Sequence, residues 1–162
     1  MSGIRKSYTE LNKIYFFTAT IHKWQPLLEP TENKALLAGY LKELSEKRLI
    51  KVYAFVIMPT HVHFIWEQLN RNGKETAPGS FLKHTAYEYL KMLKAQGFSW
   101  KYEANMANKK HEIWQRDSLS VEIYSRKVAE QKLNYIHANP VRGKWKLARD
   151  DLDYYYSSAR YY

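Results

Sequence analysis

The chain has 162 residues, a length that fits one domain, and it carries a formal net charge of +10 at pH 7. It contains no cysteine, which excludes disulfides, thiolate catalysis and cysteine-based zinc sites and fits a reducing compartment. No apolar run approaches about 18 residues and no secretion signal is visible, so we expect a cytoplasmic protein without a membrane span.

The basic charge and the aromatic content together indicate a nucleic-acid partner. A positive surface attracts phosphates, and aromatic residues make up 15% of the chain, with 14 tyrosines. Rings stack on the faces of unpaired bases while cations follow the phosphates, so this mixture favours single strands. On charge alone, a soluble basic protein without such a partner stays open. The candidate phosphate contacts include Lys83, Arg116, Arg126, Lys127 and Arg142.

The first part of the chain predicts a strand, a helix and two further strands. Residues 13–24 are rich in β-branched and aromatic types and predict a strand that Pro26 ends. Thr31 is a candidate cap for the helix that follows. Residues 50–58 become wholly apolar, which is typical of a central strand, and residues 61–67 form a second strand after a Pro-Thr break. The apolar stripe of the helix recurs at helical spacing and consists of Leu36, Leu37, Tyr40, Leu41 and Leu44.

The second part predicts a loop, a helix, a strand and a last helix. Residues 69–79 are polar and predict a loop, and Ser80 is a candidate cap for a helix that Gly97 ends. A strand is expected near residues 111–115, and a helix over residues 127–138 stops before a proline. The apolar face of the first of these helices is predicted to contain Phe81, Tyr87, Leu90 and Leu93.

The predicted order of elements is β-α-β-β-α-β followed by a helix. That order is typical of the ferredoxin-like, split βαβ fold, an α+β class in which helices pack on an antiparallel sheet. We expect one domain over residues 1–162, with its core at about residues 13–145 and a tail over residues 146–162.

The segment His61-Val62-His63 is the strongest local signal for chemistry. Residues two apart on a strand point the same way, so both imidazoles leave one face while Val62 points to the other. Two neutral imidazoles on one face form a pair of metal ligands. On its own, the motif is more often explained by two surface or half-buried histidines. The remaining histidines have no partner pattern and are expected to be structural or exposed: His22, His84, His111 and His137.

Tyr135 and Asn139 are the second candidate pair. A spacing of four places them on one face of the last helix, one turn apart. Tyr135 is a candidate nucleophile if a cation lowers the basicity of its phenol, and the Asn139 amide oxygen is a hard ligand for a divalent metal. Tyr124 is the rival nucleophile, but Val128 occupies the equivalent spacing after it and cannot bind a metal. Taken alone, a tyrosine on an amphipathic helix and an Asn-Pro helix stop require no function.

Several short blocks, in order along residues 13–158, resemble a known family. The segment 58–63, Met-Pro-Thr-His-Val-His, is similar to the Met-Pro-Asn-His-Val-His signature of the single-tyrosine HUH transposases. Residues 114–116, 135–143 and 156–158 are similar to further blocks of the REP-associated tyrosine transposase subgroup. Together these blocks favour a functional interpretation of His61, His63 and Tyr135.

The resemblance implies a single HUH catalytic domain that acts as a metal-dependent DNA nuclease and strand transferase. It implies that Tyr135 attacks single-stranded, hairpin-containing DNA and leaves a 5′-phosphotyrosyl link and a free 3′-OH. His61, His63 and Asn139 would hold Mg²⁺ or Mn²⁺, which polarises the scissile phosphate. Family members occur as swapped dimers and as monomers, so the resemblance leaves the oligomeric state open.

The chain departs from the family pattern in two places. Thr60 stands where Asn or Glu is frequent, and residues 117–122 replace an aromatic residue and often a histidine, which bears on DNA contacts rather than on the metal. Two other functions stay open: a non-catalytic protein that binds single-stranded or hairpin DNA, and a hydrolytic metallonuclease that uses water. The presence of both histidines and the tyrosine argues against the first, and only a covalent intermediate separates the second.

Overall fold

The structure is a computed structural model that describes residues 9–162. Its centre is a four-stranded antiparallel sheet in the order β2-β3-β1-β6, beside a separate two-stranded hairpin. The strands of the sheet are β1 (Ile14–Thr20), β2 (Ile50–Ile57), β3 (His61–Gln68) and β6 (Leu119–Glu122), and those of the hairpin are β4 (Glu103–Met106) and β5 (Lys109–His111). The helices are α1 (Thr31–Glu46), α2 (Ala77–Gln96) and α3 (Arg126–Ala138). The predicted α+β, ferredoxin-like fold is confirmed.

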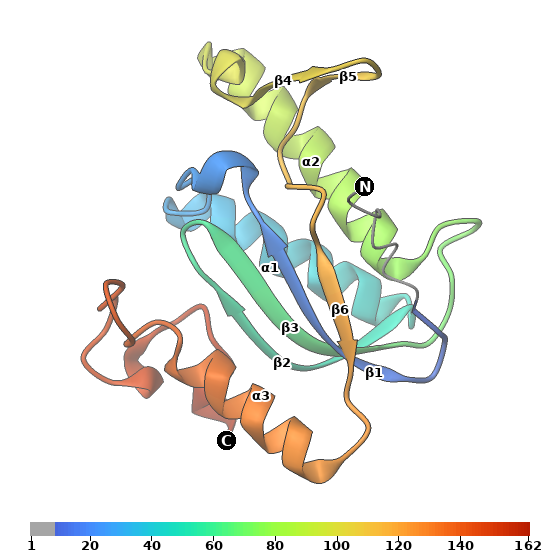
Figure 1. Cartoon of the computed structure of the whole chain (residues 1–162), viewed down its shortest axis with the longest axis vertical. Coiled ribbons are helices and arrows are strands. Elements are labelled where there is room, and N and C mark those ends of the chain that lie inside the picture. The colour runs from blue at the N-terminus through green and yellow to red at the C-terminus, as the bar shows by residue number, and fades with distance from the viewer. Residues whose placement is uncertain (1–8) are drawn as a thin grey trace, which may run out of the picture.

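Helices cover both faces of the sheet. Figure 1 shows α1 and α2 on one side of it and α3, with the C-terminal segment, on the other. The strands match this arrangement because their residues alternate: Val62 and Phe64 of β3 pack in the core beneath α1 and α2, whereas Ile65 packs with Ile136 of α3. Within residues 9–162, no helix has the length and apolar character needed to span a bilayer.

The apolar strand β2 lies at the edge of the sheet, not at its centre as its composition predicted. The C-terminal segment covers its open side. The Ile57 amide donates to the Tyr156 carbonyl at 2.9 Å, and the Ser158 amide donates to the Phe55 carbonyl at 3.0 Å. Val56 is therefore fully buried. The apolar run reflects burial rather than a central position, and residues beyond the predicted core complete the sheet.

The first strand is shorter than predicted. It ends at Thr20, and the chain turns into a short 3-10 helix, η1 (His22–Trp24), instead of continuing to residue 24. Lys23 and Trp24 have φ angles of 52° and 55°, in the left-handed region that no strand residue adopts. β-branched and aromatic content predicts strand tendency but does not reveal such a turn.

Both predicted helix caps are wrong, the first by one residue and the second by four. Thr31 is the first residue of α1, after an extended Pro30 whose cap position has no side-chain hydrogen bond. Thr76, not Ser80, caps α2, and its hydroxyl accepts from the Gly79 amide at 3.1 Å. Pro78 fits in the first turn of α2 because an amide hydrogen there has no helical partner. Ser80 consequently lies inside the helix.

The inward face of α2 also differs from the prediction at one position. Phe81 and Leu93 are buried as expected, and Leu90 is partly buried, but Tyr87 is 64% exposed. Tyr89 takes the inward position instead, fully buried, with its hydroxyl donating to the Asn33 carbonyl. Tyr87 is thus free for contacts outside the core.

The fourth strand of the sheet is β6, not the segment near residues 111–115. Within that segment, Trp114 makes only an isolated bridge with Ile21. Its indole is buried and donates to the Thr85 hydroxyl of α2 at 2.9 Å, so packing against α2 holds this stretch outside the sheet.

Candidate active site

Two histidines of β3 stand side by side on the face that α3 covers. His61 and His63 are 6% and 5% exposed, and their ring centroids lie 4.9 Å apart. Val62 between them is fully buried in the opposite core, as strand alternation predicts. The shared face expected from the His-Val-His spacing is therefore confirmed.

Threonine hydroxyls hold both rings in place. Thr60 Oγ1 lies 3.0 Å from His61 Nδ1, and Thr18 Oγ1 of β1 lies 2.8 Å from His63 Nδ1. A hydroxyl donates and accepts, so it serves either ring tautomer. Both Nε2 atoms are left for other contacts, and among the described residues His63 Nε2 is buried without a hydrogen-bond partner.

The environment keeps both imidazoles neutral. Burial lowers the pKa of His61 to about 4, although the hydrogen bond to Asn139 opposes the shift. Burial, together with the positive charge of Lys132 and that of His61 once it is protonated, lowers the pKa of His63 to about 3. A neutral imidazole has the lone pair that metal binding requires.

Helix α3 brings the tyrosine and the asparagine to this pair. Ser125 caps the helix and Ile136 anchors it on the sheet. Asn139 directly follows the helix, is 8% exposed, and has its Oδ1 at 3.3 Å from His61 Nε2. The Tyr135 ring lies edge-on to His63 with centroids 5.2 Å apart, and it is 40% exposed. The buried ligand-type groups thus stand beside a tyrosine that solvent reaches.

Tyr124, the rival nucleophile, lies in the connection between β6 and α3 and is 80% exposed. Within residues 9–162 it makes no ring contact with either histidine, whereas Tyr135 contacts His63. The structure brings four predicted residues together, and Tyr124 is not among them.

Four more residues surround the histidines and were missed from the sequence. Trp24 and Trp145 approach His61, with centroids at 5.7 and 5.8 Å, and Phe16 stacks on His63 at 5.3 Å. The Nζ of Lys132 lies 4.6 Å from the centre of the Phe16 ring. Lys132 precedes Tyr135 by three residues, so helical spacing could have revealed it. Trp24 ends the short helix η1 and Trp145 lies in a turn, and no local pattern predicts that either approaches His61.

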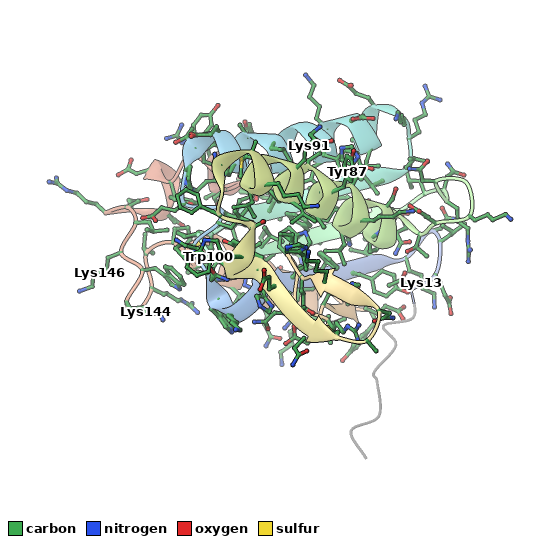
Figure 2. The ribbon with its side chains drawn as sticks, turned by 90° about the horizontal axis from the view of Figure 1, so that it is seen from above. Lys13, Tyr87, Lys91, Trp100, Lys144 and Lys146 are labelled. Carbon is green, nitrogen blue, oxygen red and sulfur yellow. The ribbon has the colours of Figure 1, made fainter. Side chains whose placement is uncertain are left out.

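The predicted phosphate contacts do not gather at one place. Arg126 and Lys127 begin α3, and Arg142 lies just after it. Lys83 and Arg116 line a groove beside α2 instead. Figure 2 shows further lysines on several sides of the molecule, with Lys13, Lys91 and Lys144 widely separated. The positive charge is therefore distributed, and charge alone does not single out a binding surface.

Comparison with known proteins identifies the fold. No protein-family model matches the sequence, and no curated protein matches it. A solved structure of a REP-associated tyrosine transposase bound to a REP hairpin is similar, with a TM-score of 0.67 and 22% identity, over 99% of this chain and 84% of that one. A candidate transposase from Deinococcus radiodurans R1 has a TM-score of 0.46 and 15% identity, over 81% of this chain and 92% of that one, a likeness too weak to bear on the fold.

Proposed function

We infer that this chain is a metal-dependent, single-tyrosine transesterase of the HUH class that acts on single-stranded or hairpin DNA, as a REP-associated tyrosine transposase does. One observation carries the proposal: His61, His63, Asn139 and Tyr135 meet on one face of the sheet, with the tyrosine open to solvent. The fold shared with a REP-associated tyrosine transposase that was solved bound to a REP hairpin supports it. The sequence blocks that carry the resemblance contain all four residues.

The side chains fit a divalent ion. His61 Nε2 and Asn139 Oδ1 are 3.3 Å apart, a separation that allows both to lie at the usual ligand distance of about 2.1 Å from one ion. The buried, unpartnered His63 Nε2 beside them would gain the partner that it otherwise lacks. Imidazole and amide ligands suit Mg²⁺ or Mn²⁺ less strongly than carboxylates, so substrate phosphate oxygens would complete the coordination. When bound, such an ion polarises the scissile phosphate and stabilises charge on the leaving 3′ oxygen.

The protein side chains supply the nucleophile and hold it in place. The Tyr135 oxygen forms a bond to phosphorus as the bond between phosphorus and the 3′ oxygen breaks. The phenol proton ends on that 3′ oxygen, which leaves a 5′-phosphotyrosyl link and a 3′-OH. Attack by another 3′-OH reverses the exchange and joins new ends, without ATP. Phe16 and His63 flank the Tyr135 ring and limit its motion, and the Lys132 ammonium beside them carries a charge that attracts the substrate phosphate.

The test is a search for a covalent protein–DNA adduct with imperfect-hairpin single strands. We expect wild type and Tyr124→Phe to form the adduct and Tyr135→Phe to lose it, by at least about 10³-fold in rate, because only the phenolic oxygen has been removed. Mass spectrometry of the digested adduct should identify Tyr135. A phosphotyrosyl peptide containing Tyr124 would overturn the assignment. Binding without an adduct would indicate a non-catalytic DNA-binding protein, and cleavage without one a hydrolytic nuclease.

A further inference from the structure

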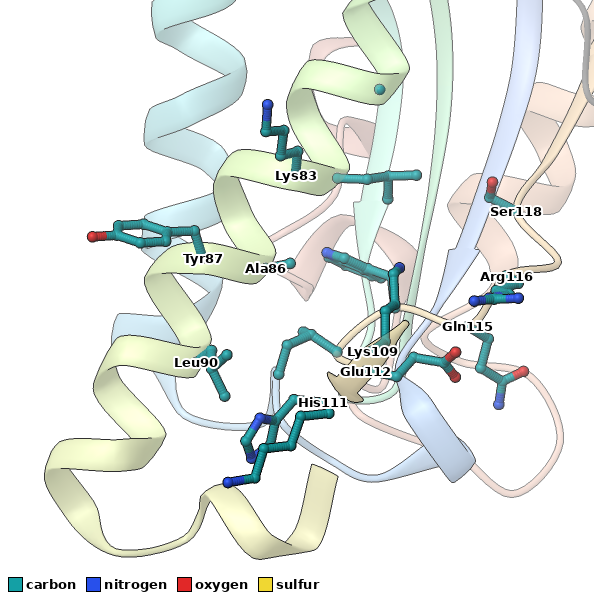
Figure 3. A pocket seen from close by; sticks show the side chains of 15 residues that line it. Lys83, Ala86, Tyr87, Leu90, Lys109, His111, Glu112, Gln115, Arg116 and Ser118 are labelled. Atoms are coloured by element: carbon teal, nitrogen blue, oxygen red, sulfur yellow. The ribbon is translucent and has the colours of Figure 1, made fainter. Parts of the chain in front are cut away.

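A hollow in the surface lies away from His61 and Tyr135. It is a groove of about 880 Å³ between α2 and residues 109–118. Figure 3 shows its two walls, with Lys83, Tyr87 and Leu90 on the helix and Lys109, Glu112 and Arg116 on the facing segment. Because α2 and α3 cover opposite faces of the sheet, the groove is not part of the histidine–tyrosine site.

The floor of the groove is apolar and firmly held. Leu82, Leu90 and Ile113 line the floor, and Trp114 lies next to Ile113 in the lining. Trp114 is 6% exposed, and its indole hydrogen bond to Thr85 fixes it against α2. A largely apolar floor of this kind suits a ligand that has apolar faces.

The rim of the groove is positively charged. Lys109, Lys110 and Arg116 are exposed, and none of them forms an ion pair within residues 9–162. Glu112 is the one acidic residue among the described residues of the lining, and its carboxylate already contacts His22 Nδ1 at 2.9 Å. The net charge around the groove therefore attracts anions such as phosphates.

The combination of floor and rim selects one kind of occupant. A DNA duplex presents sugars and phosphates on its outside, so an apolar floor does not match it. A single strand offers unpaired bases to the floor and phosphates to the rim. Tyr87, at the outer edge of the groove lining, adds an exposed ring that Figure 3 shows directed away from residues 109–118, with Lys91 Nζ 5.6 Å from its centre. Such a ring stacks on any base, whatever its identity.

The groove also approaches the candidate active site at one end. Its lining ends at Ser118, directly before β6. The next residue, Leu119, pairs with Thr18 of β1, and Thr18 hydrogen-bonds His63. Two neighbouring strands, β6 and β1, thus connect the end of the groove to His63 on β3.

We propose that this groove binds the unpaired DNA strand that flanks the segment cleaved at Tyr135. This rests on the proposed function and deepens it, because it assigns to the α2 face a subsite that grips single-stranded DNA without reading its sequence.

The test measures binding of oligothymidylate of about 12 nucleotides, a usual site size for one single-strand domain, in a Tyr135→Phe background that blocks cleavage. Tyr87→Ala and the double variant Lys109→Gln/Lys110→Gln should each weaken binding about tenfold at low salt. The double variant should also reduce the slope of log affinity against log salt by about 1.4, because it removes two lysines and each phosphate contact on a single strand contributes about 0.7. Tyr87→Ala should leave that slope unchanged, since it removes stacking rather than charge.

Matched controls keep the result specific. Lys42→Gln removes an exposed lysine from α1, away from the groove, and should bind as the parent does. Thermal melting should be unchanged in all variants, because the altered side chains are exposed. Photo-cross-linking with 5-iodouracil-substituted strands should label the peptide that contains Tyr87. Unchanged affinity in both groove variants, cross-links confined to α3, or a blunt duplex bound as tightly as the single strand would each overturn the proposal.

Adduct formation separates this proposal from the function on which it rests. If no adduct forms with wild type but the cross-link is at Tyr87, the transesterase proposal is refuted and the proposal that the groove binds single strands is supported. If the adduct forms at Tyr135 and the groove variants bind oligothymidylate as their parent does, only the groove proposal is refuted.

Discussion

Alternate residues of the same strands point to opposite faces of the sheet, and the two faces differ in character. Toward α1 and α2, Phe17 and Phe64 are almost fully buried and stack with centroids 5.9 Å apart. Toward α3, the neighbouring positions carry polar residues instead, a partly buried Thr18 and a His63 that is 5% exposed. A buried imidazole with a lowered pKa and an unpartnered nitrogen is unfavourable for stability. The first face therefore stabilises the fold, and the second carries the groups that the proposed function requires.

Removing the histidines should break the chemistry of the second face and leave the fold. His61→Ala and His63→Ala should each lower adduct formation by at least about 10³-fold, because each removes a proposed metal ligand. The free energy of unfolding should change by less than about 1 kcal/mol, since the lost groups are not well satisfied by the protein. Adduct kinetics in Mn²⁺ and thermal melting measure the two effects.

A milder ligand change is the control for that experiment. Asn139→Ala removes one of three proposed ligands, so high Mn²⁺ should restore part of its activity, whereas the double histidine variant should not recover. Wild-type cleavage by the double variant would mean that the metal binds elsewhere.

A substitution on the first face should have the opposite result, with a loss of stability and little change in activity. Phe64→Ala removes a fully buried ring that also contacts Trp66 and Phe81. We expect a loss of about 3–5 kcal/mol in the free energy of unfolding, from lost transfer energy and the cavity left behind. At a temperature where the variant is still folded, its adduct rate should stay near wild type. Denaturant unfolding and single-turnover kinetics provide the two numbers, and a stable but inactive Phe64→Ala would contradict the division between the faces.

The sequence predicted this division because it depends on local periodicity. The period of two places His61 and His63 opposite Val62, and the spacing of four aligns Tyr135 with Asn139. What the sequence did not reveal depends on segments far apart in the chain. The edge position of β2, its cover by residues 156–158, and the approach of Trp24 and Trp145 to His61 all follow from long-range packing.

Acid should lower the free energy of unfolding through the histidines of the second face. The pKa values of His61 and His63 are lowered to about 4 and about 3 in the folded protein, so the unfolded chain takes up protons that the folded protein does not. The resulting stability is present above the unfolded pKa of about 6.5 and is lost as pH falls toward the folded values. Two such groups predict that the free energy of unfolding falls by about 2–3 kcal/mol between about pH 7 and pH 5.5. Denaturant titrations with a chelator present should reveal this slope, and the double histidine variant should flatten it; equal slopes would refute the buried, neutral state of the pair.

The smallest predicted effect concerns how α3 is held over the histidines. Ser158 Oγ accepts from the Phe55 amide at 3.0 Å and lies 2.9 Å from His137 Nε2, so one buried hydroxyl links the C-terminal segment, β2 and α3. Ser158→Ala leaves both partners unsatisfied and should lower stability by about 1–2 kcal/mol. Because α3 carries Tyr135, the adduct rate should also fall a few-fold, through less accurate placement of the nucleophile. Ser45, on the exposed side of α1, offers a matched Ser→Ala control that should change neither quantity by more than about 0.5 kcal/mol. A Ser158→Ala protein that loses stability but cleaves at the wild-type rate would mean that the sheet contacts of Ile136 alone position the helix.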